Sequence, residues 1–122
     1  MLVTEILKDK GAAVFSVSPD KTLVDACREM QTRRIGAVMV CDSDRVVGVL
    51  SERDVVRAVA ASGPEALSEA VSAYMTRDVV FAEPTDTVAM LMSRMTDRRI
   101  RHLPVLRDKR LIGVISIGDV VK

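Results

Sequence analysis

The most constraining feature of this sequence is an ungapped internal duplication. At an offset of 65 residues, residues 14–57 align with residues 79–122, and 15 of the 44 aligned pairs are identical. Many of the other pairs exchange one apolar residue for another, as in Val46/Leu111 and Leu50/Ile115. Self-similarity at a fixed period indicates a repeated structural unit. We call residues 14–57 the first copy and residues 79–122 the second copy.

Each copy predicts the element order β-α-β-β-α. A β-branched stretch stops at a proline, and Thr22 or Thr87 then caps a helix whose apolar residues recur at helical spacing. Two apolar strands joined by a polar turn follow, and a second helix begins after them. The predicted strands are 14–17, 37–41 and 46–50 in the first copy, and 79–82, 103–106 and 111–115 in the second.

The closing helix differs between the copies. In the first copy it is predicted over residues 54–61 and ends at a Ser-Gly-Pro sequence. The second copy reaches Lys122 after about one turn of the equivalent helix. Either this helix is truncated or the native chain is longer.

We therefore expect an α/β (α+β) protein of two β-α-β-β-α repeats packed with pseudo-twofold symmetry. Residues 1–62 would form the first motif and residues 63–122 the second. Neither motif is large enough to fold comfortably alone, so the two are expected to share one module. Residues 64–75 predict a linker plus a short helix, mirrored by residues 2–7 before the first copy.

Composition narrows the classes of function. A formal charge of +1 gives no general attraction to nucleic acid or to an anionic membrane, and the few scattered aromatic residues offer no platform for stacking bases. No apolar run approaches the ~20 residues of a membrane span, and the charged N-terminus is unlike a signal peptide. Cys27 and Cys41 lie far apart and are interpreted as buried thiols in a reducing compartment. We expect a cytoplasmic protein with no nucleic-acid or membrane partner.

Both copies carry a Gly-x-x-Ser-x-x-Asp motif between the second apolar strand and the helix that follows. The motif spans residues 48–54 in the first copy and 113–119 in the second. Ser-x-x-Asp is a capping box, which is a purely structural interpretation. The same geometry suits a nucleotide, because a helix N-terminus favours an anion and an aspartate can accept from both hydroxyls of a ribose. The two interpretations are compatible.

The repeat, the Thr-led helices, the Arg-Arg-Ile-Arg-His-Leu-Pro-Val run at 98–105 and both motifs resemble a tandem pair of cystathionine β-synthase (CBS) domains, also called a Bateman module. The small stand-alone bacterial pairs are the most similar type, and the resemblance covers essentially the whole chain. Such proteins bind AMP, ADP, ATP, NAD(H) or S-adenosylmethionine in clefts between the copies and commonly form homodimers through their helices. The resemblance implies a regulatory, energy-sensing module that binds an adenine nucleotide and acts on a separate protein.

The resemblance also assigns roles to residues. Asp54 and Asp119 would hold ribose, and Ser51 and Ser116 would lie near phosphate. Tyr74-Met75-Thr76 falls where the family lines the adenine pocket. The full set of implied ligand contacts is Ser116, Asp119, His102, Arg101, Pro104, Gly118, Val80, Thr76, Ser51, Arg53, Asp54 and Ala37.

The two copies differ beside the motifs. Arg101-His102 in the second copy replaces Gly36-Ala37 in the first, which adds cationic or hydrogen-bond donor groups where the family places phosphates. Conversely, Arg53 stands where the second copy has Gly118. We expect two unequal sites, with the second copy holding a nucleotide better.

Other chemistry is disfavoured by the residues. His102 is the only histidine, so no histidine cluster can bind a metal, and it is interpreted either as a ligand contact or as a strand-edge residue. Ser51 and Ser116 lack a recognisable base, so no catalytic residue is expected. The methionines at helical spacing are expected to fill the core or a dimer interface. The alternative function is a constitutive dimeric interaction protein with no physiological nucleotide.

Overall fold

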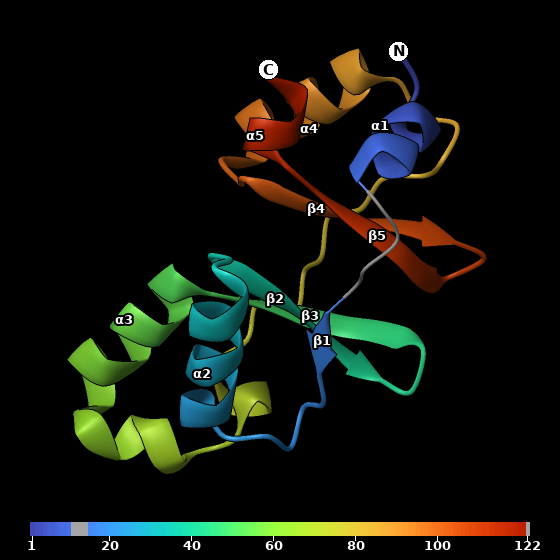
Figure 1. Ribbon diagram of the computed structural model, residues 1–122. Helices are drawn as coiled ribbons and strands as arrows, with labels where there is room; N and C mark the ends of the chain where they lie inside the picture. Colours follow the sequence, from blue (N-terminus) through green and yellow to red (C-terminus); the bar gives the residue numbers. More distant parts are fainter. Residues whose placement is uncertain (11–14, 122) are drawn as a thin grey trace. The chain divides into compact units, whose positions relative to one another are not determined.

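The chain folds into two compact units, each of mixed α+β structure, in a computed structural model that describes residues 1–10 and 15–121 (Figure 1). The first-copy unit is Phe15–Val79. The second-copy unit combines the N-terminal segment up to Lys10 with the chain from Val80 onward. The predicted fold class is confirmed, whereas the division into motifs at residues 62 and 63 stays a prediction.

The first-copy unit has the predicted order β-α-β-β-α. Its elements are β1 (Ser16–Val17), α2 (Leu23–Arg33), β2 (Ala37–Asp42), β3 (Arg45–Ser51) and α3 (Glu52–Ser62). β1 pairs in parallel with β2, and β2 pairs antiparallel with β3. Figure 1 shows α2 and α3 on the same side of these strands. Val14, the first residue of the predicted opening strand, lies outside the described residues.

The second-copy unit repeats this plan with a weaker opening strand. Its elements are α1 (Val3–Lys10), α4 (Val88–Arg98), β4 (His102–Arg107), β5 (Arg110–Ser116) and α5 (Ile117–Val120), with β4 and β5 antiparallel. The strand predicted at 79–82 is reduced to one parallel bridge between Ala82 and Val105. The reason is local, because the Val79 N–H bonds back to the Arg77 carbonyl oxygen at 3.0 Å and turns the chain.

The helices begin at their predicted caps. The Thr22 hydroxyl oxygen accepts from the Asp25 N–H at 3.2 Å, and the Thr87 hydroxyl oxygen accepts from the Met90 N–H at 3.2 Å. In α2 the Asp25 carboxylate also accepts from the Thr22 N–H, which completes the predicted capping box. Each such cap stabilises a helix by about 1 kcal/mol. The threonines therefore fix where both core-facing helices start.

The sequence also predicts that Arg33-Arg34 and Arg98-Arg99 lie in the last turns of their helices, where cations complement the helix dipole. In the structure only Arg33 and Arg98 are helical, which corrects this expectation. Arg34 and Arg99 have φ values of 56° and 54°, in the left-handed region, and close the helices as caps. This conformation is uncommon for a residue with a side chain and lets each arginine N–H bond back to the last turn of its helix.

The segment that precedes each copy packs into the unit of the other copy. Residues before the second copy form two 3₁₀ helices, η1 (Pro64–Ser68) and η2 (Val71–Ala73), instead of the predicted short α-helix. They cannot continue as one helix, because the Leu23 N–H bonds to the Glu69 carbonyl and the Val71 N–H bonds to the Lys21 carbonyl. Likewise α1, which precedes the first copy, belongs to the second-copy unit.

Each unit has its own apolar core. Leu23, Val38 and Leu50 are at most 1% exposed in the first-copy unit, and Leu91 and Ile115 are fully buried in the second. Each buried side chain of this size contributes about 1.5–3 kcal/mol. Both motifs therefore sit on strands that a packed core holds in place.

Candidate site at the two serine–aspartate motifs

The first-copy motif joins the end of β3 to the start of α3. Ser51 is the N-cap of α3, and its hydroxyl oxygen accepts from the Asp54 N–H at 3.2 Å. The Asp54 Oδ2 atom accepts from the Ser51 N–H at 2.9 Å and from the Ser51 hydroxyl at 3.1 Å. Only 8% of Asp54 is exposed. The structural interpretation of this motif as a capping box is therefore confirmed.

Thr76 adds a third donor group to the same carboxylate. Its hydroxyl lies 3.3 Å from Oδ1 and 3.5 Å from Oδ2 of Asp54. The backbone of Thr76 exchanges two hydrogen bonds with Val49 on β3, at 2.8 and 2.9 Å. The Arg57 guanidinium is more distant, 3.8 Å from Oδ1, on a side chain that is 73% exposed. Thr76 is thus held against the motif by its backbone as well as by its hydroxyl group.

The second-copy motif joins β5 to α5 in the same way. The Ser116 N–H donates to the Asp119 Oδ2 atom at 2.8 Å. His102 lies directly opposite Ser116 in the β4–β5 register, and the Ile117 N–H donates to the Arg101 carbonyl oxygen at 2.8 Å. The second-copy unit therefore gathers four of the predicted contacts at one end of its strand pair.

The remaining predicted contacts differ in accessibility. Ala37 lies opposite Ser51 in the β2–β3 register and is buried, whereas Arg53 is exposed on α3. In the second-copy unit Arg101 and Gly118 are exposed, and Val80 is half-buried against the core. Pro104 is fully buried, and its carbonyl oxygen accepts from the Ala82 N–H. The predicted set thus divides into one group on each unit.

Comparison with known proteins identifies the family. The CBS domain model matches residues 4–61 and again residues 71–122. The chain belongs to the CBS domain family. It carries two CBS copies in tandem, as the sequence motifs predicted.

Relatives of known structure share the CBS fold over the whole chain. The crystal structure of a CBS-domain containing protein from Agrobacterium tumefaciens is 43% identical, with a TM-score of 0.95 over 99% of this chain and 97% of that chain. The CBS domain pair of protein MJ0100 is 20% identical, with a TM-score of 0.83 over 98% of this chain and 92% of that one. At 20% identity, this similarity is evidence for a shared fold and for nothing further.

A curated relative is longer than this chain. A mitochondrial CBS domain-containing protein of Arabidopsis thaliana is 33% identical over 129 aligned residues. The alignment covers 98% of this chain but only 63% of the Arabidopsis protein. The similarity therefore concerns the CBS pair rather than the complete activity of that relative.

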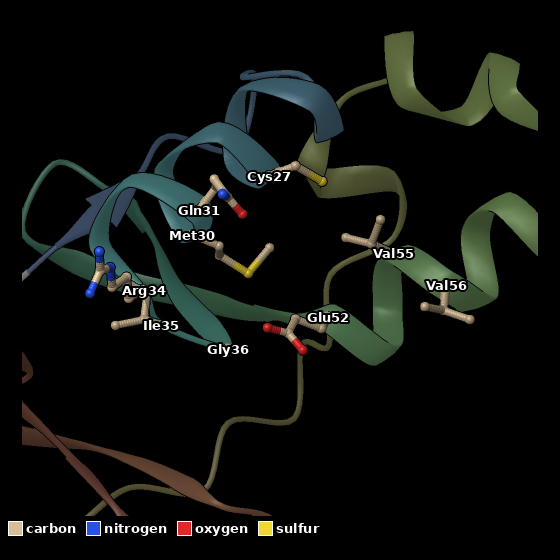
Figure 2. Close-up of a pocket in the computed structure, with 9 residues that line it drawn as sticks. All are labelled: Cys27, Met30, Gln31, Arg34, Ile35, Gly36, Glu52, Val55 and Val56. Atoms are coloured by element: carbon tan, nitrogen blue, oxygen red, sulfur yellow. The ribbon is translucent and has the colours of Figure 1, made fainter.

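The first CBS copy also carries a pocket that the sequence did not predict. The pocket has a volume of 490 Å³ and lies between α2 and α3, with Cys27 and Met30 on one wall and Val55 on the other (Figure 2). Its other lining residues are Gln31, Arg34, Ile35, Gly36, Glu52 and Val56. Sequence reasoning expected Cys27 to be buried and Met30 to fill the core or a dimer interface; Met30 is buried in the structure, whereas Cys27 is only half-buried.

The thiol in this pocket is not the buried one that the sequence predicted. Cys27 is half-buried, whereas Cys41 on β2 is only 7% exposed. Burial raises the pKa of both thiols, and for Cys41 a hydrogen bond with Ser16 opposes this effect while the nearby Asp44 carboxylate adds to it. Both cysteines are therefore protonated near neutral pH.

Metal sites and membrane-spanning helices are the remaining two features of the described residues. Within residues 1–10 and 15–121, no group of three or more histidine, cysteine or carboxylate side chains is arranged to bind a metal ion. Over the same part of the chain, none of the helices has the length and apolarity that crossing a bilayer requires.

Proposed function

We propose that this CBS pair is a regulatory module that binds an adenosine-containing ligand and so alters the activity of a separate protein. AMP is the first candidate, and ADP, ATP and NAD(H) are the others. The proposal rests on one observation: both copies of a CBS pair retain the Gly-x-x-Ser-x-x-Asp motif. It is supported by the CBS pair of protein MJ0100, which was crystallised with 5′-methylthioadenosine and S-adenosyl-L-methionine.

The residues around the second-copy motif have the chemistry that a nucleotide needs. A ribose requires a hydrogen-bond acceptor, which Asp119 supplies, and a phosphate requires donors or cations. Arg101 is exposed and His102 lies opposite Ser116, so both are placed near the motif. Charge-assisted hydrogen bonds from such groups are about twice as strong as neutral ones. In this proposal the module is cytoplasmic, senses the energy state of the cell and performs no catalysis.

A thermal-shift panel of AMP, ADP, ATP, NAD, NADH and S-adenosylmethionine tests this function. A ligand that binds the folded state raises the unfolding midpoint by mass action. We expect a shift with at least one ligand, and a smaller shift in Asp119→Asn, which keeps the shape of the side chain but removes its charge. Asp108→Asn, in the exposed turn of the same unit, is the matched control. Absence of any shift at millimolar ligand would overturn the proposal.

A second candidate function, a constitutive homodimer, is favoured by the exposed apolar helix surface. Val56 and Val121 occupy equivalent positions in the two copies and are 67% and 60% exposed. Met90 and Met92 on α4 are 43% and 40% exposed. Several large apolar side chains in water are typical of surfaces that another protein covers. We propose that a second copy of this chain covers these helices.

Light scattering during size-exclusion chromatography separates the two candidates. The wild-type chain is expected to elute with twice its chain mass of 13.3 kDa. Val56→Asp and Val121→Asp should shift the chain toward monomer, whereas Arg107→Gln on the β4–β5 turn should not. A dimer that binds no ligand of the panel would favour the constitutive interaction protein, and a wild-type monomer would exclude it.

A further inference from the structure

The Asp54 carboxylate already has hydrogen-bond partners from within its own unit. The Ser51 N–H and hydroxyl both point to Oδ2, and the Thr76 hydroxyl points to Oδ1 at 3.3 Å and Oδ2 at 3.5 Å. The side chain is 8% exposed, so little water competes for it. Each carboxylate oxygen accepts about two hydrogen bonds. Most of the accepting capacity of Asp54 is therefore used in the unliganded chain.

A ribose that binds through both hydroxyls needs one acceptor position on each carboxylate oxygen. At Asp54 three donors already use about three of the four acceptor positions, so a ligand that needs two positions competes with the Thr76 hydroxyl, which lies in hydrogen-bond range of both oxygens. The Thr76 backbone cannot withdraw easily, because it is paired with Val49 in both directions. Replacing the Thr76 hydroxyl by a ribose hydroxyl at Asp54 therefore costs part of the free energy of ligand binding.

The second copy lacks this competitor in its sequence. The residue 65 positions before Thr76 is Gly11, which has no side chain and so no hydroxyl group. Both copies retain the bond from the motif serine N–H to the aspartate, at 2.9 Å for Ser51 and 2.8 Å for Ser116. Of the two residues that donate hydrogen bonds to Asp54 within the first-copy unit, Ser51 has a serine counterpart at the 65-residue offset and Thr76 does not.

We propose that Thr76 is a specificity-determining residue that weakens ribose binding at the first copy by competing for Asp54. The inference rests on the proposed function, since it presumes an adenosine-containing ligand. It gives Thr76 a role that differs from the sequence expectation of a ligand contact. Thr76 acts through Asp54, as a positioning residue, and lowers the affinity of the first copy for a ribose.

The test is calorimetric titration of AMP into variants in which only the first copy retains its aspartate. The parent carries Asp119→Asn, and Thr76→Val or Thr76→Ser is added to it. Valine matches threonine in shape but lacks the hydroxyl, so we expect AMP to bind about 3- to 10-fold more tightly, the equivalent of one net hydrogen bond. Serine retains the hydroxyl and should stay within about twofold of the parent.

A second ligand separates competition from a general structural effect. In Thr76→Val both ribose hydroxyls can reach Asp54, so the preference for AMP over 2′-deoxy-AMP should increase by a similar factor. A change in folding alone would alter both affinities together. Weaker AMP binding in Thr76→Val would make Thr76 a ligand contact and overturn the proposal, as would equal effects of valine and serine.

A measurement without ligand keeps this inference distinct from the proposed function. In a double-mutant cycle of Thr76→Val and Asp54→Asn, the shifts of the unfolding midpoint should be non-additive, because the two side chains interact. Additive shifts would show that the Thr76 and Asp54 side chains do not interact, which would overturn the proposal. If no variant binds AMP, the competitor role fails for this ligand, the thermal-shift panel still decides the proposed function, and the cycle still reports whether the two side chains interact.

Discussion

The two copies of this CBS pair share a motif but surround it differently. Asp54 is 8% exposed and accepts from Ser51 and Thr76, whereas Asp119 is half-buried at the start of a helix of four residues. Thr76 is not part of the duplicated residues, since it lies in the segment between the copies. The difference between the motifs therefore depends on a residue that an alignment of the copies leaves out.

The glycines that open the motifs extend this comparison and carry the largest expected effect. A Cβ atom on Gly48 would lie 2.6 Å from the Met75 sulfur and 3.0 Å from the Thr76 carbonyl oxygen. A Cβ atom on Gly113 would meet the end of the Leu7 side chain at 2.5 Å, and a side-chain end can move. We expect Gly48→Ala to lower the free energy of unfolding by about 2–3 kcal/mol and Gly113→Ala by about 1 kcal/mol.

Urea unfolding of the two glycine variants measures this difference. Wild-type protein and Gly118→Ala, where an added Cβ atom would have its nearest neighbour at an ordinary 3.6 Å, provide the reference. Equal losses of unfolding free energy in Gly48→Ala and Gly113→Ala would show that the backbone around Thr76 can shift as easily as the Leu7 side chain. The close approach of Thr76 to β3 would then not restrict which residue can occupy position 48.

Removing the aspartates should give the next largest difference. Asp54→Ala deprives Ser51 and Thr76 of an acceptor, and we expect a loss of about 2 kcal/mol, one helix cap plus one buried hydrogen bond. Asp119→Ala removes a cap from a short helix and should cost about 1 kcal/mol or less. Thermal unfolding of both variants, with Asp97→Ala on the exposed face of α4 as the control, checks the order. A larger loss for Asp119→Ala would reverse the comparison.

An ion pair in the second-copy unit predicts that the stability of this unit depends on pH. Arg94 lies 2.6 Å from Asp86, whose side chain is 12% exposed, and the Glu83 N–H donates to the same carboxylate at 2.9 Å. Burial acts to raise the pKa of Asp86, but the bonds from Glu83 and Arg94 outweigh it and hold the pKa below the ordinary value of 3.8. The aligned residues in the first copy are Lys21 and Glu29, with the charges reversed.

Because the folded-state pKa of Asp86 is lowered, its contribution to stability is present above pH 3.8 and is lost as the pH falls through the folded-state pKa. We expect Asp86→Asn to cost about 1 kcal/mol at neutral pH, with the difference from wild type shrinking below about pH 4. Glu29→Gln, which removes the 3.0 Å pair with Arg33 on an exposed helix face, should cost about 0.3–0.5 kcal/mol. Urea unfolding at pH 7, 5 and 3.5 checks both, and a constant deficit for Asp86→Asn would contradict the assignment.

Much of the fold follows from the sequence because the duplication repeats its signals. Thr22 and Thr87 cap helices where predicted, and the motif serines end strands β3 and β5. These signals are local, so a short stretch of residues determines them. The strand expected at 79–82 fails because its β-branched residues meet a turn at Val79 instead of a partner strand along their length.

The site was predicted less completely, for a physical reason. The capping contacts of Asp54 lie within four residues and are readable from the motif, whereas the Thr76 contact spans 22 residues and depends on how the linker returns to β3. The pocket between α2 and α3 was missed in the same way. Cys27 and Met30 have core spacing, and whether a helix face is covered is a tertiary property.

The smallest expected effect compares the two thiols and uses this pocket to test the proposed dimer. Burial raises the pKa of Cys27 and Cys41 above 9.0, so a thiol-specific reagent should modify both slowly at pH 7 and faster as the pH rises. Cys27 lines the pocket and should react first, and mass spectrometry after brief labelling identifies the site. If the second chain that covers Val56 also covers the neighbouring pocket, Val56→Asp should increase the Cys27 rate severalfold and leave Cys41 unchanged. Equal acceleration of both thiols would indicate loosened folding instead, and no acceleration would mean that the pocket is open in the wild-type chain.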